Sequence, residues 1–182
     1  MLWLRVFLIA AIVVSAIGAW FDIKRGYIPN WVTLGGLAVG ILGHAALGLA
    51  FGGIGEGLKG LGSSVLGAFF AAVIPLFLYR ARAIGGGDVK LLAAMGALCG
   101  PMVGIEAVFY AFVAAAIYAP ARLVYEGKLF RTIGNAFYIL INPVLPKPRR
   151  KEISPEMMTE LRFGPSVLIG ALLAALLNWR LP

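Results

Sequence analysis

Six long apolar runs occupy most of this 182-residue chain and leave only short polar segments between them. A run of about 18 or more apolar residues has the length of a membrane-spanning helix. Only 13% of the residues are charged, against about a quarter in soluble domains. The sequence therefore predicts an all-α polytopic membrane protein, a bundle of about six transmembrane helices in a single membrane-embedded domain over residues 1–182. The predicted spans are Leu2–Phe21, Trp31–Phe51, Leu61–Tyr79, Val89–Gly100, Met102–Val124 and Phe163–Arg180.

The fourth run is shorter than a bilayer is thick. The twelve residues between Asp88 and Pro101 form about 18 Å of helix, against about 30 Å of hydrocarbon. Either Pro101 kinks a helix that continues toward Gly104, or Asp88 lies below the membrane surface in a wet cavity. We favour the recessed aspartate.

The basic residues gather in alternate loops. Thirteen of the sixteen lysines and arginines fall on one side of the predicted bundle, and only Arg5, Lys59 and Arg180 fall on the other. Such a bias places the basic loops in the cytoplasm and both termini outside it. The same distribution indicates contact with anionic membrane lipid and argues against a nucleic-acid partner.

The chain contains only two aspartates, Asp22 and Asp88. Asp22 closes the first apolar run and Asp88 opens the fourth, so two spans lie between them and both carboxyl groups belong to the cytoplasmic face. Ionisable groups at the edge of hydrocarbon are costly and are usually functional. If the fold brings them together, they form a carboxylate pair that shares one proton, the apparatus for cleaving a peptide bond with water. The sequence leaves open which aspartate carries the proton.

Neither a metal nor another cofactor is expected. Cys99 is the only cysteine, so a disulfide or a zinc-binding cysteine pair is excluded within the chain. His44 is the only histidine and has no acidic residue nearby in the sequence, which makes it a poor metal ligand.

A glycine triplet, Gly85-Gly86-Gly87, immediately precedes Asp88. Glycine permits backbone conformations and a close approach of substrate that other residues deny. The segment Gly85-Gly86-Gly87-Asp88-Val89-Lys90 matches the GxGDxK signature, and with it the chain resembles the type IV prepilin peptidases. Ile28-Pro29-Asn30 looks like the region that follows the first aspartate in that family, and Phe163-Gly164-Pro165 is similar to the start of its last span.

The resemblance implies a membrane aspartic endopeptidase that removes the short basic leader of prepilin-like subunits at the cytoplasmic membrane boundary. It implies that Asp22 and Asp88 are the catalytic pair, and it places seven supporting residues around them: Gly85, Gly86, Gly87, Lys90, Ile28, Pro29 and Asn30. On a helix, Lys90 points about 200° away from Asp88, which favours an anchoring role, for example at lipid phosphate.

Long members of that family carry a cytoplasmic insertion with paired cysteines and also methylate the new amino terminus. This chain passes from its first to its second run in about nine residues without a cysteine. It therefore resembles the short, peptidase-only branch that serves Tad/Flp-type pili in the prokaryotic cytoplasmic membrane. The archaeal preflagellin peptidases are similar in plan and stay open as an alternative.

A helical stripe of apolar residues runs through Phe130–Leu145. It predicts either a helix in the plane of the membrane interface, covering the cleft or presenting substrate, or a plain amphipathic connector.

Two other functions compete with this interpretation. A presenilin-type intramembrane protease also uses a GxGD motif, but its aspartates lie on adjacent spans. A proton or ion pathway also uses paired membrane acids, but it would be expected to show polar groups at the midplane or inverted repeats, and we find neither here.

Overall fold

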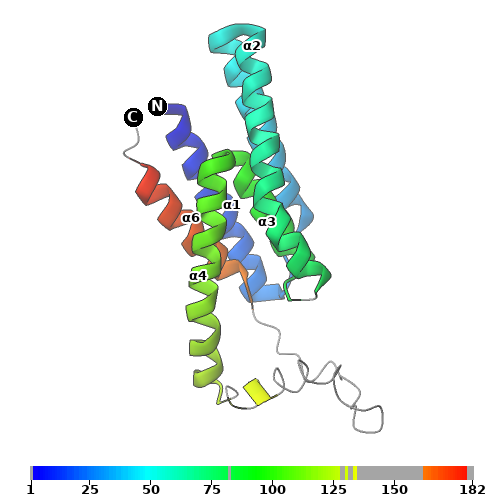
Figure 1. The fold of residues 1–182 in the computed structure, drawn as a ribbon, viewed down its shortest axis with the longest axis vertical. Coiled ribbons are helices and arrows are strands. Elements are labelled where there is room, and N and C mark those ends of the chain that lie inside the picture. Colours follow the sequence, from blue (N-terminus) through cyan, green and yellow to red (C-terminus); the bar gives the residue numbers. More distant parts are fainter. Residues whose placement is uncertain (1, 82, 128–129, 131–132, 135–161, 180–182) are drawn as a thin grey trace. The chain divides into compact units, whose positions relative to one another are not determined.

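The computed structural model describes residues 2–81, 83–127, 130, 133–134 and 162–179, and every element in this part of the chain is an α-helix. The all-α class predicted from the sequence is therefore confirmed. The predicted amphipathic helix Phe130–Leu145 lies almost entirely outside the described residues. The elements are α1 (Leu2–Arg25), α2 (Asn30–Arg80), α3 (Gly86–Cys99), α4 (Pro101–Tyr125) and α6 (Gly164–Asn178) (Figure 1).

The chain divides into two compact units, one formed by Met1–Ala115 with Arg162–Pro182 and the other by Ala116–Leu161. In the second unit, the final turns of α4 carry an ion pair in which Arg122 Nε lies 2.8 Å from Glu126 Oε1. Both aspartates belong to the first unit, so the site is described from that unit alone.

Three helices are long and apolar enough to cross a membrane, judged by length and composition: Trp3–Arg25, Asn30–Arg80 and Pro101–Tyr125. α3 has 14 residues and α6 has 15, which correspond to about 21–23 Å of helix. Both are shorter than the hydrocarbon layer of about 30 Å. The structure thus supports an integral membrane protein, but it does not confirm the predicted count of six spans.

α2 accounts for two of the six predicted runs. Its 51 residues would form a rod about 77 Å long if they were straight, but Gly53 interrupts the helix with φ 73° and ψ −168°. A residue with a side chain rarely adopts this backbone conformation. The chain doubles back there, so that a Cβ placed on Gly57 would lie 2.5 Å from Cγ of Leu49 in the opposite arm. α2 is consequently a hairpin of two helical arms (Figure 1).

α3 lies at the centre of the first unit, and Leu91, Leu92, Met95 and Leu98 on it are fully buried. A helix that is apolar all round is typically buried on every side. Small residues let the neighbouring helices approach closely, as in other membrane bundles. A Cβ on Gly40 in the first arm of α2 would lie 2.9 Å from Cβ of Ala97.

The C-terminal end of α3 is stabilised by side chains from both arms of α2. The last carbonyl groups of a helix have no partner within it, and hydrocarbon supplies no water to bind them. Ser64 Oγ donates a hydrogen bond to the carbonyl oxygen of Ala97 at 2.7 Å, and His44 Nε2 donates one to that of Leu98 at 2.9 Å. The ring of Phe7 from α1 stacks on the imidazole with 3.8 Å between centroids. Two carbonyl groups in the last turn of this short helix thus find side-chain partners inside the bundle.

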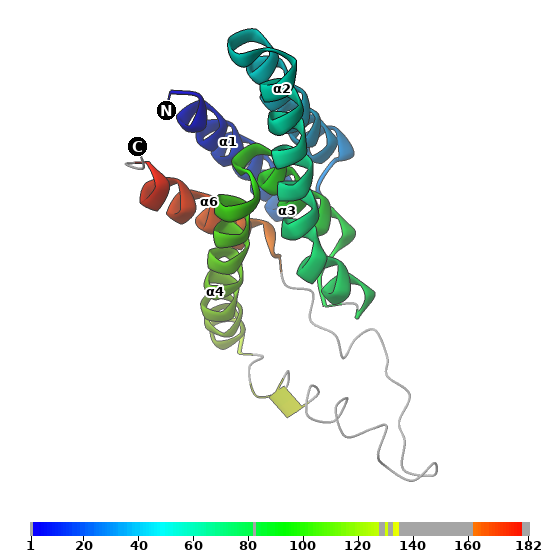
Figure 2. The ribbon, with the colours of Figure 1, turned by 45° about the horizontal axis from the view of Figure 1, so that its top comes forward.

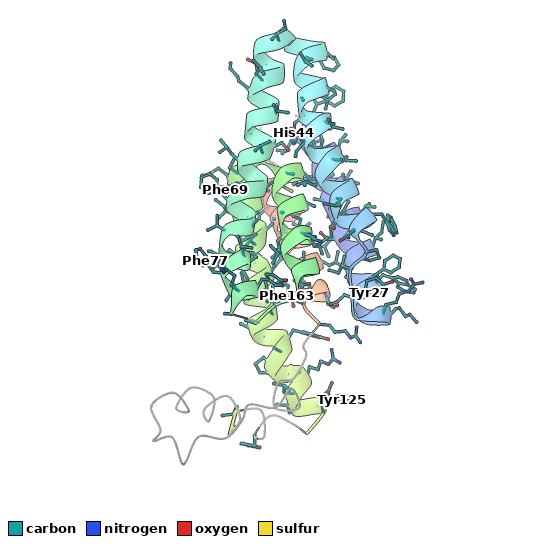
Figure 3. All side chains as sticks on the ribbon, turned by 90° about the vertical axis from the view of Figure 1, so that its right-hand side faces the viewer. Tyr27, His44, Phe69, Phe77, Tyr125 and Phe163 are labelled. Carbon is teal, nitrogen blue, oxygen red and sulfur yellow. The ribbon has the colours of Figure 1, made fainter. Side chains whose placement is uncertain are left out.

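Different helix ends and side chains lie at the two ends of the first unit. At one end, the ring of Trp3 lies 5.0 Å from that of Phe51, and Arg5 lies 5.5 Å from the ring centroid of Trp179. The start of α1, the turn of α2 and the end of α6 therefore share this end (Figures 1 and 2). The opposite end contains the end of α1, the starts of α2, α3 and α6, and both aspartates. Figure 3 shows Tyr27 and Phe163 at that end and His44 away from it.

Close packing of glycine on glycine predicts opposite outcomes for two substitutions. Gly96→Ala should lower the free energy of unfolding by about 1–3 kcal/mol, because the new Cβ would collide with the carbonyl oxygen of Gly67 and lie 2.5 Å from Cβ of Ala71. Gly62→Ala should be neutral or stabilising by up to about 1 kcal/mol, because no atom lies within 4 Å of its Cβ position. Thermal and denaturant unfolding in detergent measure both, and a Gly96→Ala protein as stable as the wild type would contradict the packing described.

Candidate active site

Asp22 lies in the last turn of α1, and its side chain is only 8% exposed. Its Oδ2 atom accepts a hydrogen bond of 2.8 Å from the backbone N–H of Gly164, the first residue of α6. Its backbone carbonyl oxygen accepts hydrogen bonds from Arg162 Nη1 and from the N–H of Gly26. Both its main chain and its side chain are thus held by the segment that leads into α6.

Asp88 lies in the first turn of α3 and is 9% exposed. Its Oδ2 atom accepts a hydrogen bond of 3.1 Å from the backbone N–H of Gly85, the N-cap residue of α3. Its Oδ1 atom is buried and has no hydrogen-bond partner among the described residues. A buried polar atom without a partner is expensive, and the hydroxyl oxygens of Ser15 and Ser166 are in the same state.

The carboxyl group of Asp88 is affected by burial and by the charge of Asp22. Asp88 lies outside the three helices that are long enough to span a membrane. Burial raises the pKa of its carboxyl group to about 6. The nearby charge of Asp22 raises this pKa as well, while the hydrogen bond from Gly85 opposes the shift. A carboxyl group that is buried beside a like charge keeps its proton more readily. The arrangement can supply one protonated and one ionised carboxyl group to the same reaction.

The segment Ile28-Pro29-Asn30 packs on the start of α3. A Cβ on Gly87 would lie 3.2 Å from Cβ of Ile28, which is buried. Lys90 Nζ donates a hydrogen bond of 3.0 Å to Oδ1 of Asn30. Pro29 is the N-cap residue of α2, with extended backbone angles. The predicted anchoring role of Lys90 at lipid phosphate is not tested, but the structure gives this side chain a partner within the protein.

The glycine triplet has an ordinary backbone. Gly85 has φ −77° and ψ 153°, and α3 begins at Gly86. Among the described residues, positive φ angles occur at other glycines: Gly26, Gly53, Gly100 and Gly127. The triplet therefore uses none of the positive-φ conformations that glycine permits. Close contacts limit side-chain size there instead, since a Cβ on Gly86 would lie 3.3 Å from the ring of Tyr79.

Comparison with known families agrees with the motif. The model of the type IV leader peptidase family matches residues 7–120, which is more than half of the chain. The chain belongs to the type IV leader peptidase family. No curated protein and no solved structure matched it. Family membership identifies the chain as a peptidase, and its long apolar helices indicate an integral membrane protein.

The candidate site includes two residues that no sequence pattern placed there. The sequence identifies Arg162 only as one of the basic residues on the cytoplasmic side, and Gly164 only as part of the Phe163-Gly164-Pro165 resemblance. Both contact Asp22, and both lie beyond the residues matched by the family model. The resemblance at Phe163-Gly164-Pro165 was the one signal that could have identified Gly164, and no signal in the sequence linked Arg162 to Asp22.

A cavity of about 430 Å³ lies at the other end of the first unit, between the start of α1 and the two arms of α2. Its walls include Trp3, Phe7, His44, Phe51 and Glu56. Neither aspartate lines it, so it is separate from the candidate active site of this leader peptidase.

The contact between Gly87 and Ile28 predicts a compensating pair of substitutions. Gly87→Val should lower the rate of leader cleavage by about tenfold or more, because its side chain displaces Ile28 and with it the start of α3, and small displacements of catalytic groups are costly. Ile28→Ala in the same protein should restore part of the rate by making room. Gly86→Ala should be mild, because its Cβ meets only the edge of the Tyr79 ring. Cleavage kinetics of the purified proteins measure this, and a wild-type rate for Gly87→Val would rule the contact out as a constraint on the site.

Proposed function

We propose that this leader peptidase is an aspartic endopeptidase, in which Asp22 and Asp88 activate water to remove the leader of prepilin-like membrane proteins. One observation carries the proposal: two buried carboxyl groups interact at one end of the bundle, and one of them has an oxygen without a hydrogen-bond partner in the described part of the chain. Membership of the type IV leader peptidase family supports the reaction class and the kind of substrate.

The proposed reaction needs one proton on the pair. The ionised aspartate takes a proton from water as the water oxygen attacks the scissile carbonyl carbon. The protonated aspartate donates a hydrogen bond to the carbonyl oxygen and stabilises the negative charge that develops on it. The C–N bond then breaks, the leaving nitrogen receives a proton from the pair, and a carboxylic acid and an amine are released.

The environments of the two aspartates favour one division of roles. The raised pKa of Asp88 makes it the better candidate for the protonated member. Asp22 would then take the proton from water, with its Oδ2 atom held by the N–H of Gly164. The Oδ1 atom of Asp88, for which the described residues offer no hydrogen-bond partner, would bind a reacting group.

We also propose that the site faces the cytoplasm. The aspartates lie at the end of the first unit that contains Lys24, Arg25 and Lys90, and the positive-inside bias favours the cytoplasm for this end. α1 and α2 are joined by only the four residues from Gly26 to Pro29. This short connection supports the peptidase-only branch, of the Tad/Flp type or the archaeal preflagellin type.

The proposed catalytic pair predicts that Asp22→Asn and Asp88→Asn each reduce leader cleavage by at least about 100-fold. Asparagine preserves the shape of the side chain but cannot exchange the proton, so the proteins should still accumulate in membranes and unfold near the wild-type temperature. Glu56→Gln is a matched control, because Glu56 is an exposed carboxylate that pairs with Lys59 at the opposite end. Cleavage of a pilin-like substrate by purified protein measures the effect, and near-normal cleavage by either aspartate variant would remove that residue from the mechanism.

The proposed orientation predicts the accessibility of two cysteines introduced in a Cys99→Ala background. Lys59 is highly exposed in the second arm of α2, and Lys24 is exposed at the end of α1 near Asp22. A membrane-impermeant maleimide should label Lys59→Cys in intact cells and Lys24→Cys only after the membrane is opened. The reverse pattern would place the aspartates on the outer face.

A further inference from the structure

The segment from Arg162 to Gly164 contacts Asp22 at two separate points. Arg162 Nη1 donates a hydrogen bond to the backbone carbonyl oxygen of Asp22, and the N–H of Gly164 donates one of 2.8 Å to its Oδ2 atom. One contact holds the main chain and the other holds the side chain. Together they limit both the position and the rotation of the carboxyl group.

The contact of Arg162 stabilises the last turn of α1. Carbonyl groups there lack partners within the helix, and a cation near a helix C-terminus is favourable. Space for the guanidinium depends on Gly26, because a Cβ there would lie 3.1 Å from Nη1 of Arg162. Gly26 also has φ +75°, a conformation that other residues rarely adopt.

The contact of Gly164 needs glycine for a different reason. A Cβ on Gly164 would lie 2.8 Å from Cβ of Asp22, 2.9 Å from its Oδ2 atom and 3.0 Å from Cα of Ala19. Since Cβ and Cα cannot move aside as the end of a flexible side chain can, α1 and α6 would have to separate or Asp22 would have to turn. Gly164 also opens α6, and the N-terminus of a helix carries partial positive charge that suits a carboxylate.

We propose that Arg162 and Gly164 are positioning residues, which hold the carboxyl group of Asp22 in the orientation that hydrolysis requires. The inference rests on the proposed function of Asp22. It assigns a role in the chemistry to the start of α6, which lies outside the residues matched by the family model.

Kinetics of purified full-length variants test this role, with a synthetic peptide of pilin-like leader sequence as substrate. Arg162→Met should lower kcat about tenfold and Gly164→Ala about 10- to 100-fold, because a displacement of about 1 Å costs about 100-fold. KM should stay within about twofold of the wild-type value, because these residues contact Asp22 and not the substrate. Arg162→Lys, which keeps the cation and a donor, should recover kcat to within about threefold of the wild type.

Two controls isolate the contact with Asp22. Arg25→Met removes a neighbouring cation whose guanidinium lies near Tyr27 Oη and the ring of Phe21. Gly35→Ala adds a Cβ where no atom lies within 4 Å. Both should retain wild-type kcat. All rates are expressed per folded molecule, from the amplitude of thermal unfolding.

The double variant Arg162→Met, Gly164→Ala separates positioning from general damage. Because both residues act on one carboxyl group, the double variant should lose about as much kcat as Gly164→Ala alone. If the two substitutions caused unrelated structural defects, their fold-losses of kcat would instead multiply. If Gly164→Ala does not fold, the comparison of Arg162→Met with Arg162→Lys decides by itself.

Any of four results would overturn the inference. The folded variants could keep the wild-type kcat, or their KM could rise at constant kcat. The losses of kcat could multiply in the double variant, or Arg162→Lys could fail to recover kcat. The proposed function has a separate test in the same assay, since it fails if Asp22→Asn cleaves as well as the wild type. The assay could show that the wild type is active, that Asp22→Asn is inactive and that Arg162→Met is unimpaired. This result would reject the positioning role and would leave the aspartic mechanism in place.

Discussion

The burial of α3 is the constraint on which the rest of the structure depends. This 14-residue helix is too short to cross hydrocarbon, so its end must be satisfied inside the protein. His44 and Ser64 bind its last carbonyl groups, and glycines on both arms of α2 allow those arms to approach it. With its C-terminal end held in this way, its first turn, which carries Asp88, lies beside the end of α1, where Asp22 is located.

The site is a junction of helix ends. α1 ends there, and α2, α3 and α6 begin there, so backbone N–H groups at two helix starts lie next to the carboxyl groups. Each aspartate accepts one of them, Asp22 from Gly164 and Asp88 from Gly85. The difference between them is that Asp88 keeps one buried oxygen without a partner among the described residues. That asymmetry suits a pair in which one member is the acid and the other the base.

The sequence by itself determined the class of protein and the identity of the candidate pair. Hydropathy is a property of each segment, so the apolar runs, the membrane assignment and the shortness of the helix after Asp88 could all be read without a structure. The scarcity of aspartates and the even number of runs between them indicated a shared face. The GxGDxK match indicated the family, and the family model then confirmed it.

Only the tertiary structure decided which residues surround the aspartates, because those contacts join segments far apart in the chain. Arg162 and Gly164 reach Asp22 across some 140 residues, and Lys90 reaches Asn30 across 60. The tertiary structure also decided which glycines have backbone angles that other residues rarely adopt. Positive φ angles occur at Gly26, Gly53 and Gly100 and not in the triplet. Periodicity and composition indicate which face of one segment is buried. The contact partners of a residue in a distant segment depend instead on how the helices pack side by side.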